Sequence, residues 1–168
     1  MSIEQLNELP DSDAQALVSQ WCASDKWVSK VVAGRPYQNK DHLIEMASRY
    51  WQQMQESDLL QAYAAHPLIG DVDLLRQKYA NTARAEQGQV MQADEGVLAE
   101  LARLNLAYRD RFGFIFIVFA SGKSAAEMLA LLQERITNSR EVELANAANE
   151  QEKIMQLRLN QYLAGSQT

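Results

Sequence analysis

The sequence predicts an all-α protein, a bundle of several helices formed as a single domain over residues 1–168. Apolar residues recur at three- and four-residue spacing along most of the chain, the pattern of helices with one buried face. Residues that cap helices stand where these patterns begin, and the three prolines and most of the seven glycines fall at the breaks. No repeat or linker divides the chain, and its length suffices for one hydrophobic core.

Two helices are predicted in the first part of the chain. The first follows Pro10 and three residues that can cap it, and its apolar positions continue at helical spacing to Trp21. A shorter helix holds the apolar residues between Trp27 and Val32, and the sequence GRP ends it. Cys22, the only cysteine, is expected to be a small buried apolar residue, and no intrachain disulfide is possible.

Two more helices lead to a histidine. Residues 41–54 place six apolar side chains on one stripe, and Asn39 or Asp41 can cap this helix. The next helix is expected over residues 58–65, and Ser57 can cap it.

His66 stands directly before a proline in the sequence AYAAHPLIGD. Pro67 disfavours helical backbone angles at residue 66, so the helix is expected to end here with the imidazole at its terminus. A histidine fixed by a rigid turn is suited to proton transfer near neutral pH. The alternative is that His66 only stabilises the dipole of the preceding helix.

The second half of the chain contains three predicted helices. They cover residues 93–113, 124–136 and 138–164. Gly113 is placed to end the first of them. Ser124 and Glu127 can form a capping box at the start of the second. Asn138 and Glu141 open the third in a similar way.

The segment FGFIFIVFASG, residues 112–122, has a different composition. It is aromatic and β-branched, which is typical of a buried strand, yet nothing else in the chain offers a partner strand. A lone strand would leave its backbone N–H and C=O groups unpaired. The segment is therefore either helical or an extended piece whose backbone groups find other partners, and a ligand could be one of them.

Composition and charge exclude several classes of function. The net charge of −6 and the absence of a basic cluster argue against binding to nucleic acid. No apolar run approaches the roughly 20 residues that span a bilayer, and the acidic N-terminus does not have the pattern of a secretory signal. We therefore expect a cytoplasmic protein without a membrane or nucleic-acid partner.

Two familiar motifs are incomplete. The sequence ASGKS suggests a phosphate loop, but that motif needs glycine where Ile117 stands, so only a weak anion site at the following helix N-terminus survives. There is no HExxH sequence and no glutamate three residues before a histidine. His42 and Glu45, one helical turn apart, are expected to be an ordinary polar pair, so no metal site is predicted.

Two charged residues each allow two interpretations. Glu86 lies in a polar stretch, and on its own it would be a surface charge. Arg158 shares a helical face with Ile154, Met155 and Tyr162. An arginine on a partly apolar face is often paired with an anion, but its stem can equally lie on the surface with the guanidinium in water.

Several segments together resemble the OHCU decarboxylases, enzymes that act on 2-oxo-4-hydroxy-4-carboxy-5-ureidoimidazoline in urate breakdown. The resemblance rests on HPLIGD, AEQ, RFGFIFIVFASGKSAAEMLALLQERITNS and ELANAANEQEKIMQLRL, in that order and spacing. It is clearest from Tyr50 to Leu159, and the chain looks like a bacterial, single-domain member. The family is all-helical, cofactor-free and usually dimeric. The resemblance therefore implies a homodimeric carboxy-lyase that needs no cofactor and produces (S)-allantoin.

The resemblance also implies a site. It places the catalytic groups at His66 and Glu86. It places substrate-binding groups at Pro67, Gln87, Arg158, Ile117, Val118, Phe119 and Ala120. In the family the strand-like segment, about 114–120, is an extended passage along the active site that lends backbone groups to the substrate.

Two departures from the family pattern concern neighbouring positions. The family's serine three residues before the glutamate is Ala83 here, so its hydrogen bond is absent, made by Thr82 or made by water. Leu68 stands where a charged residue is common.

Two other classes of function compete with the decarboxylase. An acidic helical module that dimerises or binds a partner helix would explain the periodicity, but not the joint presence of His-Pro, Glu86, Arg158 and a strand-like segment without a partner. A ring-opening hydrolase or cyclase that acts on a related heterocycle is the third reading.

Overall fold

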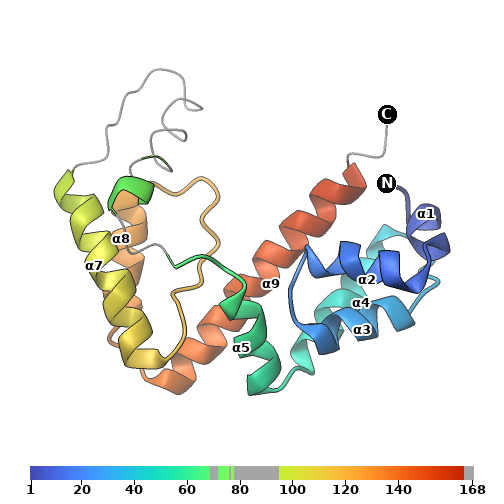
Figure 1. The fold of residues 1–168 in the computed structure, drawn as a ribbon, viewed down its shortest axis with the longest axis horizontal. Helices are drawn as coiled ribbons and strands as arrows, with labels where there is room; N and C mark the ends of the chain where they lie inside the picture. Colours follow the sequence, from blue (N-terminus) through green and yellow to red (C-terminus); the bar gives the residue numbers. More distant parts are fainter. Residues whose placement is uncertain (69–71, 76, 78–94, 165–168) are drawn as a thin grey trace. The chain divides into compact units, whose positions relative to one another are not determined.

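The computed structural model describes residues 1–68, 72–75, 77 and 95–164 (Figure 1). Within these residues the regular secondary structure is helical and no strand is present, which confirms the predicted all-α class. The chain divides into two compact units, Met1–Ala65 with Ala148–Thr168, and His66–Ala147. The long helix α9 (Arg140–Ala164) contributes residues to both. No helix in the described part is long and apolar enough to cross a membrane.

The first unit is built around α3. Its other helices, in addition to the end of α9, are α1 (Ile3–Glu8), α2 (Asp11–Ser19), α4 (Lys40–Gln52) and α5 (Glu56–Ala64), and α3 (Asp25–Ala33) packs against α2, α4 and α5. Trp27 is fully buried, and its Nε1 donates to the Ala47 carbonyl at 2.9 Å. The Nε1 of Trp51 donates to the Ala148 carbonyl at 2.9 Å and so ties α4 to α9. Indole groups thus fill the core while their only polar atom stays hydrogen-bonded.

Cys22 lies in the core of the first unit, as expected. Its side chain is buried, and burial raises the pKa of the thiol to about 12. Because only the thiolate is strongly nucleophilic, Cys22 acts here as a small apolar residue and not as a reactive group.

The helix starts of the first unit agree only partly with the sequence. The Asn39 side chain accepts from the His42 N–H at 2.8 Å, which confirms it as the cap of α4. Ser57 is not the cap of α5, because Asp58 accepts from the Gln55 N–H at 3.1 Å and the helix begins earlier. The short helix α1 was not predicted, and Ser2 caps it.

Gly34 is required where α3 ends, for a steric reason. Its φ of −74° is ordinary, but a Cβ added there would lie 2.6 Å from the hydroxyl oxygen of Tyr37 and 2.7 Å from that of Tyr50. The Tyr37 hydroxyl donates to the Val31 carbonyl at 2.5 Å, so it cannot move away without losing this bond. The predicted stop at GRP is confirmed.

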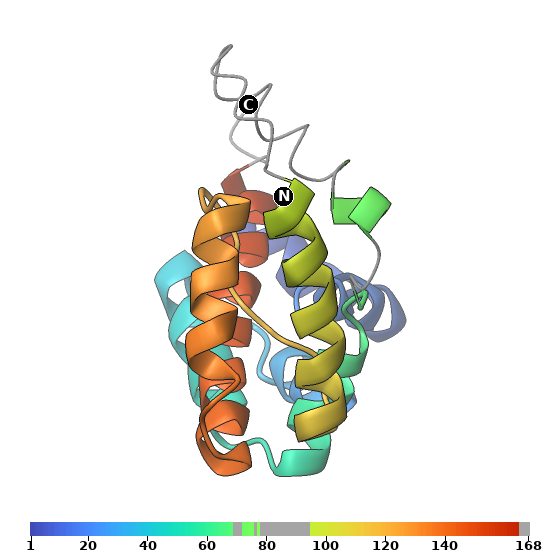
Figure 2. The same cartoon turned by 90° about the vertical axis from the view of Figure 1, so that its left-hand side faces the viewer.

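The second unit contains α7 (Glu95–Phe112), α8 (Ala125–Arg135) and the beginning of α9. Helices α7 and α8 lie side by side (Figures 1 and 2). Gly113 ends α7 with φ of +82°, a left-handed conformation that L side chains rarely adopt, and this confirms its predicted role. Ser124 caps α8 by accepting from the Glu127 N–H at 3.2 Å.

The start of α9 corrects one prediction. Asn138 is not its cap; the Ser139 hydroxyl oxygen accepts from the Val142 N–H at 3.3 Å instead. The Asn138 amide donates to Glu143, a buried carboxylate, at 2.9 Å. The need to satisfy a buried charge therefore decides which of the two neighbouring residues caps the helix.

Candidate active site

His66 follows the end of α5 immediately. The N–H of Ala65, the C-terminal cap residue, bonds to the carbonyls of Ala62 and Tyr63, and the chain bends at His66. The imidazole is half-buried, while Pro67 is exposed. The prediction that Pro67 ends the helix at this point is therefore confirmed, and His66 is held at a helix terminus by a restricted backbone.

Glu86, Gln87 and the neighbouring Ala83 lie outside the described residues. The roles of Glu86 as the acidic partner and of Gln87 in substrate binding therefore stay predictions. The effect of Ala83 in place of the family's serine is also untested by the structure.

Arg158 lies on α9 within the first unit and is exposed. Its neighbours Met155 and Leu159 are buried, so Arg158 stands at the edge of the apolar face of the helix. Its Nη1 is 3.4 Å from the Gln20 carbonyl oxygen, a long hydrogen bond. Within the described residues, this geometry leaves most of the guanidinium's five donors available to an anion, and it equally fits the solvated alternative.

The strand-like segment is neither helix nor strand. Residues 115–120 run without regular structure from Gly113 to a turn at Gly122, where φ is +75°. This outcome matches the second of the two sequence interpretations, an extended piece with other hydrogen-bond partners. Ile117 is buried, and Val118, Phe119 and Ala120 are half-buried.

Cationic side chains donate hydrogen bonds to two carbonyls of this segment. Arg135 Nη1 donates to the Ile117 carbonyl at 2.7 Å. Lys123 Nζ donates to the Phe119 carbonyl at 2.6 Å. The positive charges make these hydrogen bonds stronger than neutral ones, and they satisfy two of the carbonyls that a partner strand would otherwise pair.

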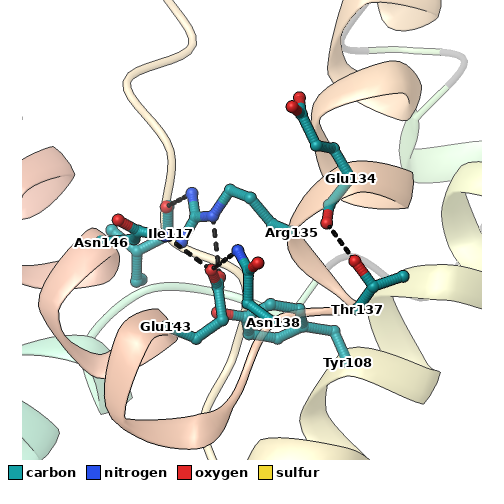
Figure 3. Close-up of polar contacts among 8 residues, drawn as sticks. All are labelled: Tyr108, Ile117, Glu134, Arg135, Thr137, Asn138, Glu143 and Asn146. Atoms are coloured by element: carbon teal, nitrogen blue, oxygen red, sulfur yellow. Dashed lines mark hydrogen bonds and ion pairs between the residues drawn. The ribbon is translucent and has the colours of Figure 1, made fainter.

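A buried carboxylate holds Arg135 in place (Figure 3). The Arg135 Nε donates to Glu143 Oε1 at 2.8 Å, and both side chains are at most 10% exposed. The Tyr108 hydroxyl donates to the same oxygen at 2.6 Å. Asn138 and Asn146 donate to Glu143 Oε2 at 2.9 and 2.7 Å. With both oxygens saturated by donors, the carboxylate can remain charged although it is buried.

The pKa of Glu143 reflects these contacts. Burial alone raises it, but the hydrogen bonds from Asn138, Tyr108 and Asn146 and the charge of Arg135 outweigh burial and lower the pKa below its usual value. Burial also raises the pKa of the Tyr108 hydroxyl, which therefore stays a donor. The cluster is thus a buried, charged group of side chains that is hydrogen-bonded to the extended segment through Arg135.

Sequence reasoning missed Arg135 and Glu143. Arg135 shares a helical face with Met128 and Leu132, which are buried. An arginine on an apolar stripe is unusual unless it has a partner, and this was the available indication. Glu143 could have been found only by noticing that Ala147, one turn later, belongs to the core.

The structure combines an all-helical fold with a histidine at a helix terminus and an extended segment held by cations. These features agree with the site that the sequence led us to expect of a decarboxylase. The family described as OHCU decarboxylase matches residues 7–160, so this chain is a member of that family.

Individual relatives agree with this assignment. The uric acid degradation bifunctional protein TTL of Arabidopsis thaliana is 35% identical over 82% of this chain, which covers 44% of that protein. The 2-oxo-4-hydroxy-4-carboxy-5-ureidoimidazoline decarboxylase of Amia calva is 33% identical over 77% of this chain and 75% of its own length. A crystal structure of OHCU decarboxylase in the presence of (S)-allantoin matches with a TM-score of 0.72 and 33% identity, covering 93% of this chain and 99% of that one.

Proposed function

We propose that this chain decarboxylates 2-oxo-4-hydroxy-4-carboxy-5-ureidoimidazoline to (S)-allantoin in urate catabolism. The observation that carries the proposal is the near-complete match to the OHCU decarboxylase structure determined in the presence of (S)-allantoin. The position of His66 at the end of α5 and the extended course of residues 115–120 support it.

The chemistry of the substrate explains why no cofactor is invoked. When the C–C bond to the carboxylate breaks, its electron pair must be accepted elsewhere. The conjugated imidazoline ring of the substrate can accept it, so no pyridoxal or thiamine group is needed. The protein must hold the carboxylate out of the ring plane, stabilise the developing charge and return a proton to one face of the ring.

The proposed roles follow from the chemistry of each group. Arg158 binds the anionic substrate through charge-assisted hydrogen bonds, together with backbone groups of residues 117–120. Glu86 binds the hydroxyl or ureido group and sets the imidazole tautomer, with Gln87 and Pro67 beside the substrate. His66 transfers the proton at the reacting carbon or its hydroxyl.

A direct assay tests the function. The unstable substrate is generated from urate in situ, the purified chain is added, and the decay of absorbance and the optical activity of the allantoin are followed. Faster decay with only the (S) enantiomer supports the proposal. An unchanged decay rate with racemic product would contradict it and favour a non-catalytic helical module.

We further propose that residues 1–168 work as one domain, in the cytoplasm and as a homodimer. The family match covers residues 7–160, a range that includes residues of both compact units. The single buried thiol suits a reducing compartment. Light scattering coupled to size exclusion should give twice the 19.0 kDa chain mass, and a mass of one chain would refute the dimer.

A further inference from the structure

The carbonyls of Ile117 and Phe119 are both held by cations, from Arg135 and Lys123 respectively. In a trans peptide, the C=O and the N–H of the same planar unit point in opposite directions. The direction of the Ile117 carbonyl therefore fixes the direction of the Val118 N–H, and the Phe119 carbonyl does the same for the Ala120 N–H. Both N–H groups point away from the cations.

These two N–H groups are available for a ligand. In the part of the chain that the structure describes, neither Val118 nor Ala120 donates its backbone N–H to another protein group. Both residues are half-buried rather than exposed. Backbone donors at such positions normally have a partner, and a bound substrate would supply one.

Arg135 is itself fixed on three sides. Its Nε donates to Glu143, its Nη1 donates to the Ile117 carbonyl, and its Cζ lies 4.6 Å from the centroid of the Phe116 ring. Its remaining Nη2 is buried and has no hydrogen-bond partner among the described residues. Buried donors normally have a hydrogen-bond partner. Since this one has none in the described part of the chain, the orientation of the guanidinium is determined by its three other contacts.

We propose that Arg135 and Lys123 are positioning residues that aim the Val118 and Ala120 N–H groups at the substrate. Neither cation touches the substrate; each acts through the carbonyl that it holds. The inference rests on the proposed function, in which the backbone of residues 117–120 binds the ureidoimidazoline.

Arg135→Lys tests the first contact. A lysine ammonium cannot bind Glu143 and the Ile117 carbonyl at the same spacing or stack on Phe116, so the peptide loses its fixed direction. We expect the KM for the substrate and the inhibition constant of (S)-allantoin to rise together, by about 10-fold, the effect of one lost hydrogen bond to a polar ligand. A merely structural role would lower kcat through a smaller active fraction and leave both constants unchanged.

Arg35→Lys is the matched control. The Arg35 side chain is only 9% exposed and also donates to backbone carbonyls, those of Leu6 and Leu9 at 2.8 and 2.7 Å, but it belongs to the first unit. This variant should lose stability while KM and the inhibition constant keep their wild-type values.

Lys123→Met is the second test, in case Arg135→Lys does not fold. Lys123 is half-buried beside a turn, and methionine keeps most of its stem, so the fold is expected to persist. Both constants should again rise, by about 3- to 10-fold. Wild-type constants in a folded variant would overturn the inference. If the wild-type chain itself shows no turnover, the proposed function fails instead, so the two failures are distinguishable.

Discussion

The imidazole of His66 is placed by its covalent neighbours. Because Pro67 disfavours helical angles at residue 66, His66 lies just beyond the end of α5 and not on the side of the helix. A terminal position gives the imidazole a constrained backbone, and the residue is only half-buried. These are the properties that a proton-transferring group needs.

His66→Asn should abolish most of the proposed turnover. Asparagine keeps a polar side chain of similar size but cannot exchange a proton near neutral pH, so kcat should fall by about 10²–10⁴-fold. The assay with in situ substrate measures kcat, and far-ultraviolet circular dichroism should show an unchanged helix content. Turnover at the wild-type rate would remove His66 from the mechanism.

Arg158→Ala should mainly weaken binding. Because Arg158 is exposed and is proposed to bind the substrate anion in the ground state, KM should rise by about 10-fold or more while kcat changes little. Arg49→Ala is the control, since Arg49 is another exposed helical arginine, paired with Glu45. Equal kinetics in the two variants would leave Arg158 as a solvated surface residue.

At the scale of elements, the course of the extended segment depends on how α7 ends just before it. Gly113 ends α7 with a positive φ, and nothing lies within 4 Å of an added Cβ. A substitution there meets only the conformational cost of the left-handed region. Gly34 presents the opposite case, with an ordinary φ and two hydroxyl oxygens within 3 Å of an added Cβ.

The variants Gly113→Ala and Gly34→Ala separate these two costs. Gly113→Ala should lower the free energy of unfolding by about 1–2 kcal/mol through backbone strain. Gly34→Ala should lower it by about 1–3 kcal/mol through overpacking against Tyr37 and Tyr50. Urea titration measures both. Adding Tyr50→Phe to Gly34→Ala should recover part of the loss, and no recovery would show that the steric explanation is wrong.

Glu143 should make stability depend on pH in the acidic range. Its pKa in the folded chain is below the usual value of 4.5, so it binds protons less tightly than in the unfolded chain. Its contribution to stability is therefore complete above about pH 4.5 and is lost as the pH falls through the lower folded value. The free-energy difference between wild type and Glu143→Gln, from urea titrations, should shrink below pH 4.5. A constant difference down to pH 3 would contradict this.

Local rules predicted some of these features and missed others. Pro67 restricts the backbone of the residue before it, and Gly113 adopts a positive φ itself, so the sequence was enough to place the helix ends beside them. Asn138 was assigned wrongly because its amide serves Glu143, a partner that sequence spacing did not reveal. Arg135 and Glu143 are defined by tertiary contacts with each other, and each alone resembles an ordinary helix residue.

At the scale of the whole molecule, α9 joins two compact units. A single helix that contributes to both cores should couple their unfolding, since melting it would expose apolar surface in each. We expect one calorimetric transition whose van't Hoff and calorimetric enthalpies agree. Two separable transitions would show that the units fold independently and would contradict a single domain over residues 1–168.

The proposed mechanism requires three groups, far apart in sequence, to act on one substrate. A crystal structure of this chain with (S)-allantoin tests this directly. We predict that one ligand molecule contacts the His66 imidazole, the Arg158 guanidinium and the Val118 backbone N–H. A ligand bound away from His66, or contacted by neither Arg158 nor the segment from Ile117 to Ala120, would contradict the proposed site.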